Sequence, residues 1–430
     1  MAEYYNKLKS AIKLNKFKYA DSLLDQILDK KINIDAQDKK NNTLIMKVIY
    51  KDYHVVINDM IIHKFIQCAK AGICNLNLQK NGMTALILAL IRKNKYIAHQ
   101  LIESKSCNLN LQDEFGCTAL MYAIRYDVLD IIELLIDYDC DLYLKNKRGT
   151  IALYCLFEYP NISRTTKLKT FEKIIVKMDI KYLNNFNNIG NIYNHYDNHA
   201  CLIKNLTYDV WNNNVTEDDN FYIFKRLYEL GYNMGQRNYI WNYTPMVDSV
   251  LTTIPHNKNI NIILKLIELN CDINLVTNFG TTALSNAILS GQPLIVKKLL
   301  SHNVDFRTTL YFTDTKIKMT PFELAICKNN GYKVAIKNNS RWQETMIPYY
   351  KLYTLRLNDI MYALVDKYLE EKDYSFIDYM EKYNEIKNDK IIAQKIKTAY
   401  KQDFIKNNES DVYSVLVDNN MVTIIIDYLF

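Results

Sequence analysis

The sequence predicts an all-α solenoid in which short helix pairs stack in a row. Gly82, Gly116 and Gly149 are separated by 34 and 33 residues, and each opens a similar frame: GMTALILA, GCTALMYA and GTIALYCL. A fixed period of this length is typical of stacked structural repeats. The chain has 430 residues, of which 49% are hydrophobic, so it is long enough for an array in which every unit contacts only its neighbours.

Each period carries the pattern of two short helices. Between Asp113 and Lys145, two groups of apolar residues each share a helical face: Leu120, Ala123 and Ile124, then Leu129, Ile132, Leu135 and Ile136. Residues 126–128 form the tight connection between the two helices. Gly116 permits a turn with positive φ, Thr118 can cap the first helix, and the small Ala123 lets neighbouring first helices approach. One such unit cannot bury both its faces, so the units must stack.

Composition narrows the class of protein. The 54 basic and 47 acidic residues give a net charge of +7 without a block of like charge, which does not favour nucleic acid as a partner. The 9 cysteines lack a CxxC pair, which argues against a disulfide framework or zinc ribbon and indicates a reducing compartment. Because no secretory signal and no apolar run of about 20 residues is present, we expect a soluble, cytoplasmic protein that does not enter a membrane.

Motifs for catalysis and cofactor binding are missing from the sequence. It contains no Gly-rich phosphate loop, no GxSxG, no HExxH and no EF-hand loop, so we predict neither enzymatic activity nor a cofactor. His195 and His199 stand four residues apart with Cys201 nearby, which on a helix could bring three ligands to one metal ion. A fourth ligand at zinc-site spacing is not evident, so no metal site is predicted.

Two short motifs recur along the chain. The first opens the unit, in GMTAL (82–86), GCTAL (116–120), GTTAL (280–284) and TPFELA (320–325), and the second closes it, in CNLN (107–110), CDLY (140–143) and CDIN (271–274). These motifs resemble the Thr-Pro-Leu-His signature and the Ala-Asp-Val-Asn loop of the ankyrin-repeat family, whose unit is a β-turn followed by two antiparallel helices. The signature His is absent from each of these units. The resemblance implies that Cys107, Cys140 and Cys271 replace a small buried Ala, so we interpret them as core thiols.

Weaker copies extend the array. Residues 19–38 resemble the second half of an opening repeat, 41–45 start the next unit without its glycine, and ACLI (200–203) and YTPM (243–246) stand where two further first helices are expected. We predict about nine units within residues 1–340, with an irregular stretch around 159–220. After Ser340 the glycine frame stops while helical periodicity continues, so we predict a separate helical region at 341–430.

The positions that differ between repeats are candidates for partner binding. In ankyrin-like proteins the turn tips and the ends of the first helices line a concave face that contacts protein partners, and aromatic and Arg residues are frequent anchors. The candidate tip residues are Lys80, Asn81, Met83, Glu114, Phe115, Cys117, Asn278 and Phe279, and the candidate helix-end residues are Ile91, Arg92, Arg125, Tyr126, Leu289 and Ser290. Phe115 and Phe279 have an alternative role, which is to pack on the adjacent turn. Arg125 and Tyr126 have no expected role within the repeat, which makes them the preferred contacts.

Residues 418–430, DNNMVTIIIDYLF, have the pattern of an apolar helix. They resemble the opening helix of an F-box through Met421, Val422, Ile425, Ile426 and Leu429, although DNNM (418–421) replaces the Leu-Pro-x-Glu of that motif. A truncated F-box after ankyrin repeats is an arrangement known in poxvirus host-range proteins. The resemblance implies docking on the Skp subunit of a Skp-cullin-F-box (SCF) ubiquitin ligase. The alternative is a helix that packs on the rest of the C-terminal region.

Three hypotheses of function are consistent with the sequence. The first is a non-catalytic module that binds a protein partner, and specifically a host protein in the host cytoplasm. The abundance of Lys, Asn, Ile and Tyr is typical of an AT-rich genome, which together with degenerate repeats suggests a virus or an intracellular parasite. The second is a substrate adaptor for an SCF ubiquitin ligase. The third is an enzyme whose site lies in the irregular 160–220 segment or in the C-terminal region.

Overall fold

The structure is a computed structural model. It describes residues 2–38, 41–50, 55–159, 161–186, 217–234, 260–269, 271, 273–312, 317–337, 347–373, 375–376 and 389–407. Internal contacts divide the chain into two units, Met1–Asn233 and Met234–Phe430. The described residues are mostly helical, with one pair of short strands, and they confirm the predicted all-α repeat fold.

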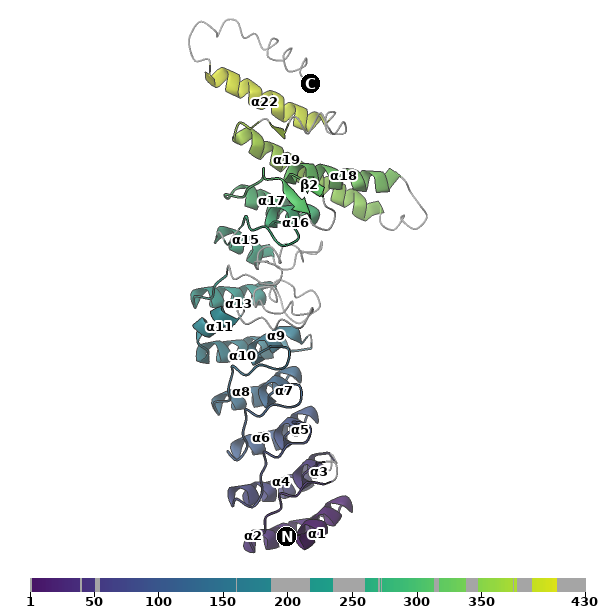
Figure 1. The fold of residues 1–430 in the computed structure, drawn as a ribbon, viewed down its shortest axis with the longest axis vertical. Helices are drawn as coiled ribbons and strands as arrows, with labels where there is room; N and C mark the ends of the chain where they lie inside the picture. Colours follow the sequence, from purple (N-terminus) through teal and green to yellow (C-terminus); the bar gives the residue numbers. More distant parts are fainter. Residues whose placement is uncertain are drawn as a thin grey trace. The chain divides into compact units, whose positions relative to one another are not determined.

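The first unit is a stack of helix pairs (Figure 1). Its helices are α1 (Ala2–Lys13), α2 (Phe17–Asp29), α3 (Leu44–Tyr50), α4 (Val55–Lys70), α5 (Ala85–Ile91), α6 (Lys95–Glu103), α7 (Ala119–Arg125), α8 (Leu129–Asp137), α9 (Ala152–Glu158), α10 (Arg164–Lys177), α11 (Ile180–Phe186) and α13 (Glu217–Glu229). The first helices α3, α5, α7 and α9 pack on one another in order, and the second helices α2, α4, α6, α8 and α10 do the same. The unit therefore has two helical layers, which we call the inner layer (first helices) and the outer layer (second helices).

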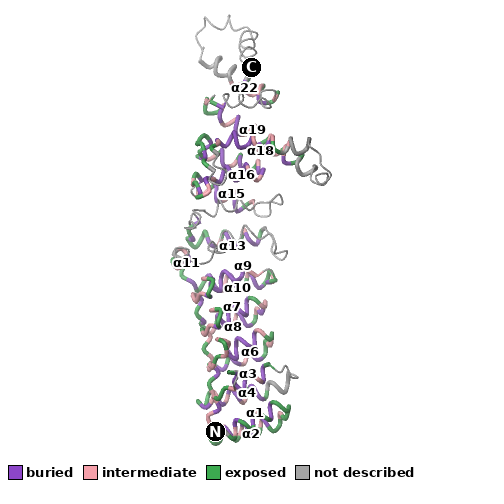
Figure 2. The backbone as a smooth tube through the Cα atoms, turned by 45° about the vertical axis from the view of Figure 1, so that its right-hand side comes forward, coloured by how far each residue is buried: buried purple, intermediate pink, exposed green. Residues whose placement is uncertain are grey.

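The inner helices are short and are buried on nearly every side. In α5 the residues from Ala85 to Leu90 are all buried, and in α7 those from Ala119 to Ile124 are. The small side chains of Ala89 and Ala123 have no exposed surface, which allows neighbouring inner helices to approach. Figure 2 shows buried residues following the helices of this unit, while exposed residues lie in the connections and along the outer helices. The predicted helix pair within residues 113–145 is thus confirmed.

The threonines at the start of the inner helices form caps, as predicted for Thr118. The Thr84 hydroxyl accepts a hydrogen bond from the Ile87 amide at 3.2 Å, and the Thr118 hydroxyl accepts one from the Met121 amide at 3.4 Å. Each bond satisfies a backbone N–H that has no partner within its own helix.

Two of the three periodic glycines, Gly82 and Gly116, are required by the stacking of the turns. Gly82 has a φ of 77°, and a Cβ atom at this position would lie 2.4 Å from the backbone carbonyl carbon of Asp113 in the next turn. Gly116 has a φ of 74°, and a Cβ atom there would lie 2.8 Å from the Lys147 amide nitrogen. Each glycine therefore serves a positive φ and a close approach of the following turn.

A row of side-chain to backbone hydrogen bonds joins the loops that follow the outer helices. The Asn110 side-chain oxygen accepts a bond from the Asp141 amide of the next repeat at 2.7 Å. One repeat further, Tyr143 replaces the Asn, and its hydroxyl accepts a bond from the Asp179 amide at 2.9 Å. The same link recurs at Asn77 with Asn108, Asn184 with Asn233, and Asn274 with Asp305. The closing motif of the repeat is thus also the connector between repeats.

The second unit has the same alternation of helices. Its elements are α15 (Ile260–Glu268), α16 (Ala283–Leu289), α17 (Pro293–Leu300), β1 (Leu310–Phe312), β2 (Ile317–Met319), α18 (Pro321–Lys337), α19 (Ile347–Glu370) and α22 (Lys390–Asn407). The two strands are antiparallel, with Leu310 opposite Met319. Helix α16 packs on α18, and α17 packs on both α15 and α19. The Thr282 side chain caps α16 through a reciprocal capping box with Ser285.

The predicted change near residue 340 falls between α18 and α19, which pack on each other as a pair. The loop after α19 has the features of a repeat end: Lys372 has a φ of 54°, close to the 55° of Asp139, and the Asp373 carboxylate accepts a bond from the Ser375 amide at 3.0 Å. Arg307, in the preceding loop, forms an ion pair with Asp373 at 2.6 Å. The repeat-like packing thus continues to about residue 376, while the division of the chain at 340 stays a prediction.

Two expectations from the sequence concern membrane spanning and the helices of the irregular stretch. Within the described ranges, no helix has both the length and the low charge that crossing a lipid bilayer requires. The first helices expected at 200–203 and 243–246 lie outside the described residues.

Candidate partner-binding surface

The turn tips of the first unit form a continuous row. At the first tip, the backbones of Lys80 and Met83 exchange hydrogen bonds of 3.0 and 2.9 Å, which close a tight turn. The Glu114 amide donates to the Asn81 carbonyl at 3.3 Å, so the second tip is bonded directly to the first. In the same way the Lys147 amide donates to the Phe115 carbonyl at 2.9 Å. The predicted tip residues are therefore held beside one another by backbone bonds.

The side chains on these tips differ in exposure. Asn81 and Glu114 are exposed, while Lys80 and Met83 are half-buried. Phe115 is 61% exposed, which is unusual for a large apolar side chain. The turn is built by its backbone and by Asp113, whose carboxylate accepts bonds from the Phe115 and Cys117 amides at 2.9 and 2.8 Å. The aromatic ring of Phe115 is thus not needed to form the turn.

The ends of the inner helices contact the next repeat. The guanidinium carbon of Arg125, at the end of α7, lies 5.6 Å from the centre of the Tyr159 ring. The Tyr126 ring stacks on Tyr122 at 6.2 Å and lies 5.8 Å from the Lys93 ammonium nitrogen. The interpretation that Arg125 and Tyr126 have no role within the repeats is therefore wrong, because both take part in contacts that join the inner helices.

The tips and the inner-helix ends face the same side of the stack. Two contacts run between them: the Lys80 ammonium nitrogen lies 5.2 Å from the centre of the Tyr50 ring at the end of α3, and the Thr150 hydroxyl donates to the Glu158 carboxylate at 3.0 Å. In the middle of α7, the Tyr122 hydroxyl donates to the carboxylate of Asp113, which precedes the second tip, at 2.7 Å. We call this surface the inner face. It comprises tip residues 80–83, 114–117 and 147–150 and helix-end residues 91–93, 125–127 and 158–159.

Electrostatics around Cys117 also place these groups together. Burial raises the pKa of the Cys117 thiol, and the carboxylate of Asp113 acts in the same direction. The guanidinium groups of Arg125, from an inner-helix end, and Arg148, from the next tip, oppose this rise. Both positive charges therefore lie close to the same tip residue.

Four of the predicted residues lie in the second unit. Asn278 is exposed, and Phe279, Leu289 and Ser290 are half-buried. The first two occupy a turn in which the Gly280 amide donates to the Thr277 carbonyl at 2.9 Å, and the other two lie at the end of α16. They hold the same places in their repeat as the inner-face residues do in the first unit.

The cysteines expected in the core are poor candidates for nucleophiles. Burial raises the pKa of the Cys107 and Cys140 thiols to about 12, so at neutral pH both remain protonated. Cys271 is half-buried. Among the residues that the structure describes, no group of three or more His, Cys, Asp or Glu side chains is arranged to hold a metal ion. The candidates His195, His199 and Cys201 lie outside those residues.

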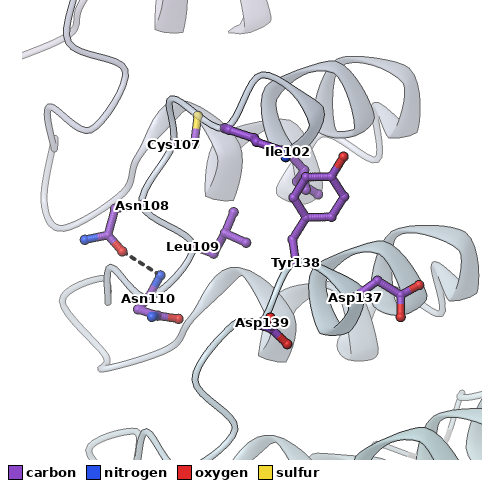
Figure 3. A pocket seen from close by; sticks show the side chains of 9 residues that line it. Ile102, Cys107, Asn108, Leu109, Asn110, Asp137, Tyr138 and Asp139 are labelled. Atoms are coloured by element: carbon purple, nitrogen blue, oxygen red, sulfur yellow. Dashed lines mark hydrogen bonds between the residues drawn. The ribbon is translucent and has the colours of Figure 1, made fainter.

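An open pocket of about 620 Å³ lies between the loops that follow α6 and α8 (Figure 3). The Tyr138 ring projects from the end of α8 towards Ile102. Two pocket carboxylates are already paired, Asp137 with Lys173 at 2.7 Å and Asp139 with Lys177 at 2.7 Å. The residues that line the pocket are Ile102, Lys105, Cys107, Asn108, Leu109, Asn110, Asp137, Tyr138 and Asp139. Asn110, Asp137 and Asp139 of this pocket therefore form bonds that connect neighbouring repeats.

Sequence reasoning missed several inner-face residues. Lys147 and Arg148 occupy the third tip, where the period of 33 residues places them opposite Glu114 and Phe115. Tyr159 stands 33 residues after Tyr126 and occupies the same helix-end position. A strict alignment of the three frames would have identified all of them. The apolar residues of the suggested F-box helix (Met421, Val422, Ile425, Ile426 and Leu429) lie outside the described residues.

Comparison with known proteins agrees with this geometry for residues 54–161 of the stack. A family model described as ankyrin repeats (3 copies) matches residues 54–146 and 92–161. No curated protein matches the chain. Residues 54–161 therefore contain ankyrin repeats, and the predicted resemblance is confirmed for that part, which includes α5 to α9 and the inner face.

Proposed function

We propose that the chain is a non-catalytic protein-binding module whose partner contacts the inner face. Ankyrin repeats are generally protein-interaction modules, and residues 54–161 contain them. The observation that carries the proposal is the exposed Phe115 ring on a tip that is built without it. An aromatic side chain with exposed surface is the kind of residue that contributes most to binding at protein interfaces.

The residues that hold the stack together are different from the exposed side chains of the tips, and this supports the proposal. The stack is held by buried apolar side chains, helix caps and the Asn and Tyr links between loops. The tips are held by their backbone bonds, by the carboxylate of Asp113 or the amide of Asn146, and by the side-chain amides of Gln79 and Gln112. The exposed tip side chains therefore vary at little cost to stability, and in this way a repeat protein acquires a partner.

Capture of the partner tests the proposal. The full-length chain, immobilised, is incubated with cell lysate, and retained proteins are identified by mass spectrometry. We expect a specific partner to be retained by the wild type and lost with the double variant Phe115→Ala and Arg148→Ala. The matched control is Tyr96→Ala with Lys169→Ala, which removes an exposed aromatic residue and an exposed cation from outer helices. A partner retained equally by both variants would place recognition away from the inner face.

The proposal that the partner is a host protein rests on the amino-acid composition of the chain. The abundance of Lys, Asn, Ile and Tyr supports an AT-rich virus or intracellular parasite as the source, and hence a host protein as the partner and the host cytoplasm as the location. Proximity labelling in host cells tests both parts. We expect labelled cytosolic host proteins, and labelling restricted to another compartment would contradict the proposed location.

The SCF adaptor is an alternative supported by the pattern of residues 418–430. Pull-downs with and without residues 410–430 distinguish it from simple partner binding. Retention of the Skp subunit and the cullin by the full-length chain, and their loss on truncation, would support the adaptor role. Their absence from the full-length pull-down would end it.

A further inference from the structure

The inner face of the first unit carries an excess of positive charge. Its basic residues are Lys80, Arg92, Lys93, Arg125, Lys147 and Arg148, and its acidic residues are Glu114, Asp127 and Glu158. Two of the three carboxylates already accept hydrogen bonds from neighbouring hydroxyls: Glu158 from Thr150 at 3.0 Å, and Asp127 from Ser163 at 3.1 Å. With six cations against three carboxylates, this face has a net positive charge.

Several cations of the outer layer have a carboxylate partner within the stack. On the outer layer, Lys173 and Lys177 are paired with Asp137 and Asp139, each at 2.7 Å. Lys95 lies 3.8 Å from Asp130. On the inner face, by contrast, none of the side chains of Lys80, Lys93, Arg125, Lys147 and Arg148 forms an ion pair with another described residue. These five positive charges are thus left for an external anion.

Aromatic rings hold three of these cations in place. Lys80, Lys93 and Arg125 lie over the rings of Tyr50, Tyr126 and Tyr159, at 5.2, 5.8 and 5.6 Å from the ring centres. A cation on a ring face loses conformational freedom before a ligand arrives, while its outward N–H groups remain available as donors. This arrangement favours carboxylates, which accept hydrogen bonds from ammonium and guanidinium groups.

We propose that the inner face binds an acidic, extended peptide segment of the partner protein; this deepens the proposed protein-binding function and rests on it. Neighbouring helices in a stack lie about 8–10 Å apart, and an extended peptide advances about 3.3 Å per residue. A peptide that runs along the stack therefore meets the next repeat about every third residue. The preferred segment carries Asp or Glu at about this spacing, with an apolar residue in reach of Phe115.

A nucleic acid fits the same face less well. Glu114 is exposed on the middle tip, between the basic residues Lys80 and Lys147 of the flanking tips. A nucleic-acid strand carries a phosphate at every nucleotide and would bring negative charge against Glu114. A peptide can place a neutral or basic residue there. The alternation of charge along the tips therefore favours a peptide.

Selection from a random peptide library tests the inference. Peptides of about 12 residues span about 40 Å when extended, which covers about four repeats. The full-length chain is the bait, and the selected peptides are compared with the unselected library. We expect enrichment of Asp and Glu at a spacing of about three residues. Failure to select any peptide, or selection of sequences without acidic enrichment, would overturn the inference.

Charge reversal shows where the selected peptides bind. Lys147→Glu with Arg148→Glu changes two exposed side chains that have no role in the stack, and we expect affinity to fall at least about tenfold, because like charges then oppose each other. Lys169→Glu with Lys181→Glu makes the same change of net charge on α10 and α11 and leaves affinity unchanged. Equal losses in both variants would indicate a net-charge effect and overturn the inference.

Two further binding experiments distinguish carboxylate from phosphate as the anion that the inner face binds. Phosphorylated versions of the selected peptides show whether phosphate replaces carboxylate: equal or weaker binding supports the carboxylate assignment, and a requirement for phosphate overturns it. A single-stranded DNA that binds more tightly than the peptides, and is lost in the Lys147 and Arg148 variant, would also overturn it. If the partner is captured through Phe115 but its binding segment is neutral, the inference fails while the protein-binding function stands.

Discussion

The guanidinium carbon of Arg125 lies 5.6 Å from the centre of the Tyr159 ring in the next repeat. Arg125 ends α7, and Tyr159 follows α9, so the pair joins two neighbouring inner helices. Arg125 remains exposed in this position. One side chain therefore contributes to the contact between repeats and to the positive charge of the inner face.

Substitution of Arg125 separates these two contributions. Arg125→Ala removes an exposed cation–π contact, which is expected to lower the free energy of unfolding by roughly 0.5–1 kcal/mol. Partner affinity should fall further than this, and Arg125→Lys should restore most of it because the charge returns. Urea unfolding and a binding titration measure the two effects. A loss of several kcal/mol in stability would show that the contact is mainly structural.

The two roles of the periodic glycines are separable with a matched pair. Gly72 and Gly82 both have positive φ, at 71° and 77°, but a Cβ atom at Gly72 meets nothing within 4 Å. Gly72→Ala is expected to lower the free energy of unfolding by about 1–2 kcal/mol through backbone strain alone. Gly82→Ala should exceed it by at least about 2 kcal/mol, because its Cβ would overlap the next turn. Similar losses by urea unfolding would refute the close approach of the tips.

The link at Tyr143 is tested by removing one oxygen atom. Tyr143→Phe keeps the edge contact with the Tyr182 ring at 4.5 Å but deletes the acceptor of the Asp179 amide. We expect the free energy of unfolding to fall by roughly 0.5–1.5 kcal/mol. Tyr96→Phe, at an exposed position of α6, serves as the control and should have no effect. An unchanged midpoint for Tyr143→Phe would show that water replaces the lost bond.

Burial of Cys140 makes stability depend on pH. Burial raises the pKa of this thiol from 9.0 to about 12, so the folded state retains its proton more tightly than the unfolded state does. Its contribution is full below pH 9 and is lost as the pH rises from 9 to about 12. Urea unfolding across this range should show a smaller decline for Cys140→Ala than for the wild type. Parallel declines would mean that the thiol is accessible to water in the folded state.

Features of the structure that depend on residues within one repeat can be predicted from the sequence, while contacts between repeats cannot. The turn at Gly116 and the cap at Thr118 depend on residues within one repeat, and both were predictable. The contact of Arg125 with Tyr159 depends on the offset between neighbouring repeats, which a single repeat does not contain. The pairing of α18 with α19 lacks the glycine frame, and its repeat-like end becomes visible in the structure through the positive φ of Lys372 and the bonds of Asp373 to Ser375 and Arg307.

Photo-crosslinking tests the central claim most directly, since it reports contact and not affinity. A photoreactive phenylalanine analogue replaces Phe115 on the inner face or Tyr96 on the outer layer, both exposed aromatic positions in the full-length chain. Irradiation with the captured partner should give a covalent adduct from position 115 and none from position 96. An adduct from position 96 alone, or from neither position, would contradict binding at the inner face.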